Sequence, residues 1–391
     1  MNLLVISSGL KQGPNGGFPL GLLYVAANDP NTKILDLTVS NVDIVKYIKE
    51  NKPEIVGTTI YTPNRHDALR ILKIAKKNGC KTVAGGPHVS VSKEQLLEYY
   101  GQVVDHFVLG DGELSWKQIC SGTTEKVLKN RVENLDDLPH PDFSLVNWRE
   151  YKTVTGDEPK YIRHFRGHDL KTEFPLPVAF GRGCSAKCHF CSTWWVNGKY
   201  HHHGKAWMED LFQKMWDNGV RRLTFVDDCL TADMKAAYEL CDALEKFDFA
   251  WFGTSRVDCI DNDLARRLSE VGCFGLSFGV ETSSDSVLEN MNKKAKVESA
   301  FSAREACRKA GIFFTALMMM GYPGMTQETQ KQDNEFIHKL KPDDIGCLGE
   351  TWVLPGTVLY NTCKRLGLIT DDFWLGPEPY YVFPSNINAK L

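Results

Sequence analysis

Short apolar runs alternate with helical patterns along residues 1–122. The apolar runs predict β-strands at 3–7, 33–37, 55–60, 81–84 and 106–109. Between them, apolar positions at helical spacing predict helices at 20–27, 42–50, 66–78 and 93–100. Strands that alternate with helices across short connections form parallel βαβ units, so we predict an open, doubly wound, Rossmann-like sheet. Ligands of such sheets bind at the carboxyl ends of the strands.

The same alternation returns after an irregular region. Residues 123–174 show no clear period and contain several prolines, so we predict a linker region there. Further strands are predicted at 177–180, 222–226, 251–255, 275–280, 313–320 and 345–353, with helices between them at 208–218, 234–247, 263–271, 297–310 and 326–340. These six units predict a (β/α)6 partial TIM barrel over 175–369, followed by a tail at 370–391. The whole chain is thus expected to be of the α/β class.

Composition and charge limit the class of protein and its partners. The 391 residues include 46 Lys and Arg against 49 Asp and Glu, a net charge of −3, and 42% of them are hydrophobic. This composition is typical of globular domains and excludes a disordered chain. A charge so close to balance gives no general reason to expect nucleic acid as a partner. No apolar stretch approaches the ~18 residues that span a bilayer, and no basic leader precedes the first strand, so we expect a cytoplasmic protein without membrane contact.

Three of the twelve cysteines are packed together. Cys184, Cys188 and Cys191 lie in the run GRGCSAKCHFC, directly after the first predicted strand of the barrel. Thiolates at this spacing on one loop can converge on one metal centre. A structural zinc site needs a fourth protein ligand, whereas a 4Fe–4S cluster held by three cysteines leaves one iron open for a chelating molecule. The other nine cysteines are scattered singly, which is typical of small buried hydrophobic residues.

In their order along residues 177–368, these features resemble the radical S-adenosylmethionine (SAM) superfamily. The resemblance implies that Cys184, Cys188 and Cys191 hold a 4Fe–4S cluster and that Phe190 lies beside the adenine of SAM. Segments 225–228, 254–256, 279–282, 320–324 and 353–357 match the motifs at the ends of the later strands. On these segments the resemblance implies SAM contacts from Asp227, Asp228, Ser255, Arg256, Glu281, Gly321 and Pro323.

The chemistry of SAM agrees with these residue types. Its ammonium group needs acceptors such as Asp227 and Asp228, and its carboxylate needs a cation such as Arg256. Its ribose hydroxyls need an acceptor such as Glu281. Structural roles stay open for each residue taken singly, because both aspartates precede a predicted helix that they can cap, and Arg256 can serve in an ion pair.

The first domain, residues 1–122, resembles the cobalamin-binding domain of the cobalamin-dependent radical SAM subfamily, through segments 18–24, 57–59, 85–88 and 109–113. The resemblance implies cobalamin contacts from Thr58, Thr59, Gly85, Gly86, Pro87, His88, Gly110 and Glu113. Small residues at these strand ends let a large planar ligand approach the backbone. The motif D-x-H-x-x-G, which supplies a histidine below the cobalt elsewhere, is absent, so we expect no such ligand, and a vestigial sheet is the alternative.

Together, the two resemblances imply a cobalamin-dependent radical SAM enzyme, above all a methyltransferase acting on an unactivated carbon of a small molecule or peptide. Reductive cleavage of SAM would give methionine and a 5′-deoxyadenosyl radical, which takes a hydrogen from the substrate before methylcobalamin delivers a methyl group. An electron donor such as flavodoxin or ferredoxin is implied. Two alternatives stay open: cyclisation, rearrangement or dehydrogenation by the same radical, with or without cobalamin, and an iron–sulfur redox sensor without turnover.

Overall fold

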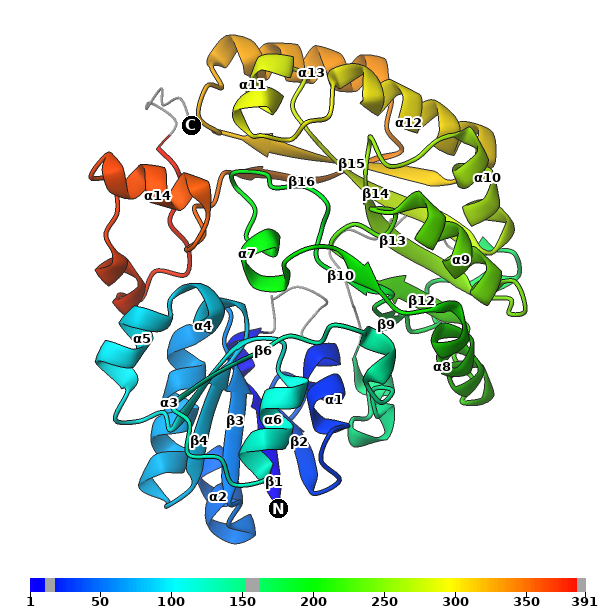
Figure 1. Ribbon diagram of the computed structural model, residues 1–391. Helices are drawn as coiled ribbons and strands as arrows, with labels where there is room; N and C mark the ends of the chain where they lie inside the picture. Colours follow the sequence, from blue (N-terminus) through cyan, green and yellow to red (C-terminus); the bar gives the residue numbers. More distant parts are fainter. Residues whose placement is uncertain (11–17, 152–161, 163, 385–391) are drawn as a thin grey trace. The chain divides into compact units, whose positions relative to one another are not determined.

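The computed structural model describes residues 1–10, 18–151, 162 and 164–384 (Figure 1). The chain forms two compact units. The first unit comprises residues 1–152 together with 195–197 and 363–380, and the second comprises 153–194, 198–362 and 381–391. Each unit is built around one six-stranded sheet.

The sheet of the first unit is parallel, with the strand order β2-β1-β3-β4-β5-β6. Its strands are β1 (Asn2–Ile6), β2 (Thr32–Asp36), β3 (Ile55–Thr59), β4 (Lys81–Gly85), β5 (His106–Gly110) and β6 (Val127–Asn130). Its helices are α1 (Leu20–Ala26), α2 (Ile44–Asn51), α3 (Arg65–Lys77), α4 (Pro87–Val91), α5 (Lys93–Tyr100) and α6 (Glu113–Cys120). The predicted doubly wound, Rossmann-like sheet is confirmed.

Successive side chains of each strand pack on opposite faces of this sheet. On one face, Leu4 and Ile6 pack with α1 and with Trp116 of α6. On the other face, Leu3 and Val5 pack with α2 and α3. Figure 1 shows α1 and α6 together in front of the sheet. Because side chains alternate along a strand, helices on both faces require continuous apolar runs, which is the pattern that the sequence shows.

The structure adds α4, α6 and β6 to the elements that the pattern predicts. The indole N–H of Trp116 in α6 donates to the Thr32 hydroxyl at 2.8 Å, which anchors that helix on the sheet. β6 pairs with β5 inside the region predicted to be a linker. Its four residues include one fully buried side chain, Leu128, so the strand is too short to show a period.

The sheet of the second unit is also parallel, with the order β16-β15-β14-β13-β12-β9. Its strands are β9 (Leu176–Val178), β12 (Arg222–Phe225), β13 (Ala250–Arg256), β14 (Cys273–Glu281), β15 (Phe313–Met320) and β16 (Asp344–Glu350). Its longer helices are α8 (Lys205–Asp217), α9 (Met234–Leu244), α10 (Asn262–Glu270), α12 (Val297–Ala310) and α13 (Gln327–Leu340). Since β9 and β16 do not pair with each other, the barrel stays open, and the predicted (β/α)6 partial TIM barrel is confirmed.

Shorter elements complete the chain. They are β7 (His164–Phe165), β8 (His168–Asp169), β10 (Gly181–Arg182), β11 (His201–His202), α7 (Thr193–Asn197), α11 (Asp285–Asn290) and α14 (Val358–Arg365). Several helices of the second unit begin at a side chain that accepts first-turn amides: Asp233 for α9, Asp261 for α10 and Thr326 for α13. These local signals explain why the helix starts follow the predicted ones closely.

The long helices cover the outer face of the barrel sheet (Figure 1). Phe278 and Phe314 stack with ring centroids 4.5 Å apart, and the guanidinium of Arg304 from α12 lies 6.0 Å from the Phe314 ring. Because side chains alternate along a strand, the neighbouring positions point to the inner face. That inner face ends at the carboxyl edge of the strands, where a barrel of this type carries its functional residues.

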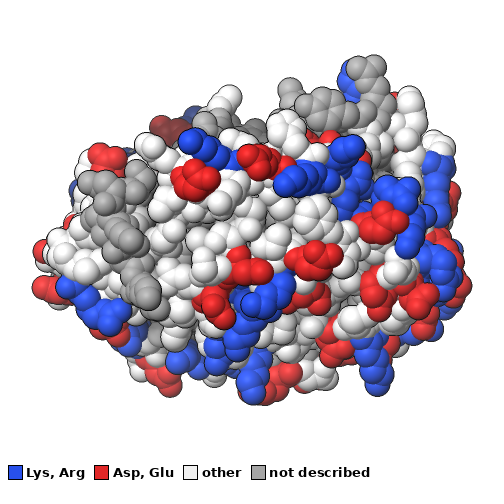
Figure 2. All heavy atoms as spheres, turned by 90° about the horizontal axis from the view of Figure 1, so that it is seen from above, with Lys and Arg blue, Asp and Glu red and all other residues white. Residues whose placement is uncertain are grey.

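Acidic and basic side chains are interspersed over the face of the molecule that Figure 2 shows. This mixture agrees with the net charge of −3. Many of the charges form local helical pairs, such as Arg308 with Glu305 at 2.8 Å. Among the described residues, we find no helix that is both long and apolar enough to cross a membrane.

Candidate active site

The three clustered cysteines lie on a loop that a short hairpin closes. β10 and β11 pair in antiparallel fashion, and the loop between them carries the cysteines. Gly183, directly before Cys184, has φ 81°, and a Cβ atom there would lie 2.7 Å from the carbonyl oxygens of Gly198 and Lys199. Only glycine fits this position, so the GRGC run is explained by the turn itself.

Asp227 ties the base of this cysteine loop to the sheet. It follows β12, is 5% exposed, and accepts the backbone N–H groups of Phe180 at 3.0 Å and Gly181 at 2.5 Å. Burial raises the pKa of Asp227 to about 7, although the two amides oppose this shift. The next helix, α9, is capped by Asp233, so Asp227 does not serve as its cap. Its carboxylate positions the cysteine loop, and its contact with SAM stays a prediction.

Further contacts hold the middle of the loop. The exposed carboxylate of Asp228 accepts the Thr193 hydroxyl at 2.8 Å. The backbone N–H of His189 donates to the Met291 carbonyl at 2.9 Å, and its ring Nδ1 lies 2.9 Å from the Asn290 carbonyl oxygen. The imidazole between two of the cysteines is therefore engaged by the loop that follows α11.

The three cysteines are free thiols of intermediate exposure. A hydrogen bond from the buried Cys229 thiol lowers the pKa of Cys184 to about 6, whereas burial raises the pKa of Cys191 to about 11. Burial also raises the pKa of Cys188. The sequence groups Cys229 with the scattered cysteines, because only the pairing of β12 with β9 brings it next to Cys184.

The described residues form no site for a single metal ion. Within the described part of the chain, no three His, Cys, Asp or Glu side chains meet closely enough to hold one ion. The cysteines of a 4Fe–4S cluster bind different iron atoms, so this finding concerns mononuclear sites and not a cluster.

The residues at the end of β13 form hydrogen bonds and an ion pair with other residues of the protein. The Ser255 hydroxyl, 2% exposed, lies 2.5 Å from the Thr231 hydroxyl. Arg256 forms a two-pronged ion pair with Asp258, with N–O distances of 2.9 and 2.7 Å. Its Nη1 also lies 3.7 Å from the sulfur of Cys188. The ion pair that the sequence left open is thus present, and contacts of Arg256 and Ser255 with SAM stay predictions.

The end of β14 presents a second buried ion pair. Glu281 has φ 70°, just after a register shift against β15, and its carboxylate lies 2.5 Å from the Lys293 ammonium. Both residues are less than a tenth exposed. A Cβ atom at Gly279 would lie 2.6 Å from each charged group, so glycine makes room for the pair. The sequence misses Lys293, because its run Asn-Lys-Lys-Ala-Lys is typical of an exposed loop.

The turn after β15 packs against the same region. Gly321 has φ 69°, and the Pro323 carbonyl accepts the side-chain amide of Asn290 at 2.8 Å. The Phe190 ring lies edge-to-face with Tyr322, with centroids 6.1 Å apart. Asn290 therefore bonds both to this turn and to the cysteine loop. The predicted cluster and SAM residues lie on loops that this network ties together at one end of the sheet.

The predicted cobalamin residues lie at the carboxyl end of the first sheet. Thr58 and Thr59 end β3, Gly85 to His88 join β4 to α4, and Gly110 and Glu113 flank the turn between β5 and α6. Gly86 has φ 100°, and a Cβ atom there would lie 2.6 Å from the Thr59 hydroxyl and 2.8 Å from the Ile60 nitrogen. The protein's own packing requires this glycine, and the approach of cobalamin to it stays a prediction. At Gly85 a Cβ atom would meet only Val108, at the ordinary distance of 3.6 Å.

His88 is a predicted cobalamin residue whose pKa is strongly shifted by its surroundings. It is 1% exposed, and its Nδ1 lies 3.2 Å from the Thr62 hydroxyl. Burial lowers the pKa of His88 to about 3, so the imidazole is neutral. Its Nε2 finds no hydrogen-bond partner among the described residues. The Trp374 ring lies edge-on beside it, with centroids 6.2 Å apart.

Ser7 and Asn64, which the sequence does not identify as site residues, join the loops after β1 and β3. Asn64 donates to the Ser7 hydroxyl at 2.9 Å and accepts the Tyr61 backbone N–H at 2.7 Å. β1 and β3 are the strands at which the order of this sheet reverses, which is where open α/β sheets bind their ligands. The glycine-rich runs of the sequence predict ligand contacts after β4 and β5 instead. Single polar residues such as Asn64 form no motif from which a contact can be predicted.

The C-terminal segment 371–380 belongs to the first unit. Arg65, at the start of α3 and 1% exposed, donates to the carbonyl oxygens of Trp374 at 2.7 Å, Gly376 at 2.6 Å and Glu378 at 2.6 Å. The first of these bonds joins residues 309 positions apart. No local pattern can predict such a contact, and the sequence predicts a tail at 370–391 without its partner.

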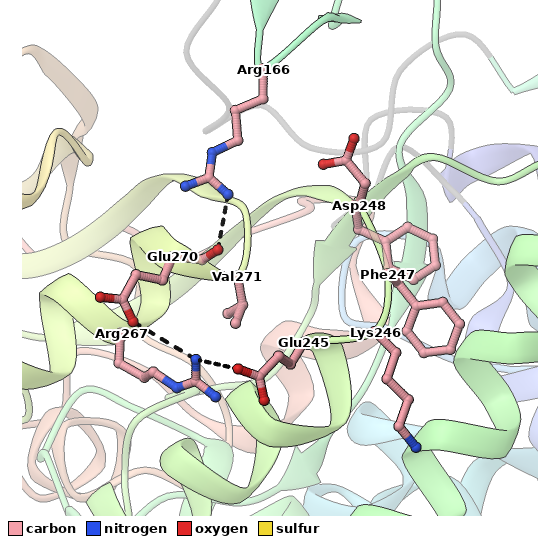
Figure 3. Close-up of a pocket in the computed structure, with 9 residues that line it drawn as sticks. Arg166, Glu245, Lys246, Phe247, Asp248, Arg267, Glu270 and Val271 are labelled. Carbon is pink, nitrogen blue, oxygen red and sulfur yellow. Dashed lines mark hydrogen bonds and ion pairs between the residues drawn. The ribbon is translucent and has the colours of Figure 1, made fainter.

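A polar pocket of about 460 Å³ lies at the other end of the second sheet, on the loops that precede β13 and β14 (Figure 3). Several of its charged side chains are engaged within the protein. Arg267 pairs with Glu245 at 3.3 Å and with Glu270 at 3.7 Å, and Arg166 donates to the Glu270 carbonyl at 3.0 Å. We therefore place the candidate active site at the cysteine loop.

Comparison with known families agrees with both halves of this description. A model of the radical SAM superfamily matches residues 178–337, and a model of the B12 binding domain matches residues 13–119. The chain joins a B12-binding domain to a radical SAM domain. It is an enzyme of the radical SAM class, and the relatives that it matches include methyltransferases. The redox-sensor alternative is therefore not retained.

Individual relatives cover most of the chain. PH0819 of Pyrococcus horikoshii, an uncharacterized methyltransferase, is 28% identical over 92% of this chain and 81% of its own length. The anaerobic magnesium-protoporphyrin IX monomethyl ester cyclase of Cereibacter sphaeroides is 24% identical over 78% of this chain and 52% of its own length. The structure of the radical SAM methyltransferase TsrM from Kitasatospora setae, with cobalamin and a 4Fe-4S cluster bound, has a TM-score of 0.73 at 18% identity. It covers 94% of this chain and 78% of that chain, and it supports the fold.

The two domains imply three cofactors. A radical SAM domain implies a 4Fe–4S cluster and SAM, and a B12-binding domain implies cobalamin. The described residues fit these groups. Three half-buried thiols on one loop, with buried cations beside Cys188, suit an anionic cluster. Hydroxyl, amide and neutral imidazole groups at the end of the first sheet suit a corrin, whose side chains are amides.

Proposed function

We propose that this radical SAM enzyme is a cobalamin-dependent methyltransferase that acts on an unactivated carbon of a small-molecule or peptide substrate. The observation that carries the proposal is the cysteine loop, tied to the carboxyl ends of the barrel strands in a chain that also has a B12-binding domain. The methyltransferase PH0819, which aligns over most of its own length, supports methyl transfer.

In this proposal each group of the radical SAM domain has a defined part. Cys184, Cys188 and Cys191 hold the cluster, and Asp227 keeps their loop in place through two backbone amides. Glu281 accepts a ribose hydroxyl of SAM once its ion pair with Lys293 opens. When bound, the cluster and SAM supply a 5′-deoxyadenosyl radical, and cobalamin supplies the methyl group. An electron donor such as flavodoxin or ferredoxin provides the reducing equivalent.

Cobalamin binds, in the same proposal, at the carboxyl end of the first sheet. Gly85 is the sharpest position for a test, because the protein itself tolerates a Cβ atom there. Chain loaded anaerobically with hydroxocobalamin should retain about one corrin per chain, and Gly85→Ala should weaken retention without changing thermal unfolding. Because D-x-H-x-x-G is absent, bound cob(II)alamin should show no nitrogen splitting from a protein histidine in its paramagnetic resonance spectrum.

One experiment tests methyl transfer without knowledge of the substrate. Enzyme loaded with cluster and cobalamin is incubated with dithionite and SAM that carries a labelled methyl group. We expect label in the corrin fraction, and 5′-deoxyadenosine as a separate product of reductive SAM cleavage. Deoxyadenosine without any label in the corrin would refute the methyltransferase and leave the radical chemistry intact.

The second candidate function is cyclisation, rearrangement or dehydrogenation by the same radical. The match to the anaerobic magnesium-protoporphyrin IX monomethyl ester cyclase favours it, although the chain spans only about half of that protein. A cyclase needs the cluster and SAM but no methyl transfer. The labelling experiment therefore separates the two functions directly.

A further inference from the structure

The guanidinium of Arg256 has its fork occupied by the protein itself. Nε and Nη2 donate to the two oxygens of Asp258 at 2.9 and 2.7 Å, and Nη2 also donates to the Lys293 carbonyl at 2.6 Å. A SAM carboxylate would need the same fork for a two-pronged contact. The geometry therefore points to a further task for Arg256, beside the contact with SAM that stays a prediction.

The remaining side of the guanidinium faces a cysteine. Nη1 of Arg256 lies 3.7 Å from the sulfur of Cys188, within the range of an N–H···S hydrogen bond. Arg256 is 7% exposed and Asp258 clamps it from the opposite side, so this donor is held in place. Bonds from ionised donors are stronger than neutral ones, and a site shielded from water screens them little.

Lys293 brings a second cation to the same sulfur. Its side chain is 6% exposed, and its ammonium lies 2.5 Å from the Glu281 carboxylate. The Lys293 carbonyl accepts Nη2 of Arg256 at 2.6 Å, so the two cations lie in the same buried region. Within the described part of the chain, Cys188 is the cluster cysteine that an arginine contacts directly.

We propose that Arg256, supported by Lys293, raises the reduction potential of the 4Fe–4S cluster by stabilising the negative charge that the cluster gains at Cys188. This inference rests on the proposed function, because it takes Cys188 as a cluster ligand. One electron passes from an external low-potential donor of the flavodoxin or ferredoxin class to the cluster, and no proton moves. Hydrogen bonds to the ligand sulfurs and the net charge around a cluster are known determinants of its potential. Arginine suits this task because it stays charged at every accessible pH.

The test measures the potential of the cluster in the absence of SAM. Reconstituted enzyme is titrated with dithionite against redox mediators, and the reduced cluster is followed by paramagnetic resonance. In Arg256→Gln we expect the ratio of reduced to oxidised cluster at a fixed potential to fall about tenfold, a shift of about 59 mV for one electron. Arg256→Lys should shift it less, and Lys293→Gln should shift it in the same direction.

The matched control is Arg266→Gln, which removes the same charge from an exposed side chain on α10. Its potential should equal that of the unchanged enzyme. Equal potentials in Arg256→Gln and Lys293→Gln, at full iron content, would overturn the inference. If Arg256→Gln assembles no cluster, an unchanged potential in Lys293→Gln and Arg256→Lys overturns it instead. Absence of any iron–sulfur signal in the unsubstituted enzyme would overturn the proposed function, which keeps the two failures distinct.

Discussion

The two parallel sheets differ in the buried side chains at their carboxyl ends. At the carboxyl end of the barrel sheet, buried charges gather: Arg256, Lys293 and Glu281 are each less than a tenth exposed. At the carboxyl end of the first sheet, Asn64 and His88 are also buried, but one is an amide and the other is an imidazole that burial keeps neutral. The buried acidic residues Asp111 and Glu113 also lie at this end, so both ends are polar, and a buried arginine beside a cluster cysteine distinguishes the barrel end.

The difference reflects what each end is built to hold. A buried charge costs several kcal/mol unless it is paired, so a protein keeps such charges only where they have a task. Charged groups suit an anionic cluster and the zwitterionic end of SAM. Neutral donors and acceptors suit the amide side chains of a corrin. Arg65 is a buried charge of the first unit, and its guanidinium donates to four carbonyl groups of that same unit.

The largest expected effect is the loss of the iron–sulfur cluster from the barrel end. Cys188→Ala should abolish the roughly four iron and four sulfide per chain expected after anaerobic reconstitution, together with the visible absorption of the cluster. Cys241→Ala, which removes a buried thiol of α9 instead, should leave the iron content unchanged. Iron and sulfide analysis of the two variants checks this, and full iron in Cys188→Ala would exclude that cysteine as a ligand.

The next largest effect concerns Arg65, a buried arginine of the first unit. Arg65→Met should release segment 371–380, because at least three tail carbonyls lose their donor, and we expect a local cost of about 3 kcal/mol. Hydrogen–deuterium exchange of peptides from this segment should accelerate by about two orders of magnitude. Arg70→Met, on the same helix and 55% exposed, is the control. Equal exchange in both variants would show that the tail is held by other contacts.

The predictable part of the fold is the part with a long, regular pattern. β15 lies where the sequence predicts it, at Phe313–Met320, because eight successive strand residues with a helix on either side leave little choice. β6 and α11 are too short to show a period. The docking of segment 371–380 is determined by a contact across 309 positions, which sequence spacing does not contain.

The site divides in the same way. The cysteine loop is found from sequence because its three thiols and its glycines lie within one local run. Lys293, Cys229 and the bonds of Asp227 are missed or misassigned, because strands distant in sequence bring their partners together. Charged residues of this kind gain their meaning only from burial, and burial is a property of the fold.

A third prediction concerns the affinity of the barrel end for SAM. Glu281→Gln should weaken SAM binding roughly tenfold to a hundredfold, since a lost charge-assisted hydrogen bond is worth about 1.5–3 kcal/mol. Iron content should stay unchanged, because Glu281 is not proposed to touch the cluster. Calorimetric titration of SAM into the cluster-loaded enzyme checks this, with the exposed Glu289→Gln of α11 as control. Equal affinities in both variants would remove Glu281 from the SAM site.

The last expected effect concerns the pH dependence of folding at Asp227. Burial raises its pKa to about 7 in the folded protein, from the usual value of 3.8 that the unfolded chain retains. Between these two pH values the folded state binds more protons than the unfolded state, so this group lowers the free energy of unfolding as the pH rises from about 4 to about 7. Above about pH 7 the loss is complete.

Asp227→Asn should remove this slope, because an amide does not titrate. Its single oxygen can accept only one of the two backbone N–H groups that the two carboxylate oxygens accept from Phe180 and Gly181, and the lost bond is a constant cost at every pH. Relative to the unsubstituted protein, the variant should therefore gain stability between pH 4 and pH 7. Urea unfolding at a series of pH values measures the difference, and Asp228→Asn, which keeps both amide bonds of Asp227, is the control. A difference that stays constant with pH would mean that the two amides, and not burial, decide the protonation of Asp227. Asp227 would then be an anion at the barrel end, where the buried cations Arg256 and Lys293 also lie.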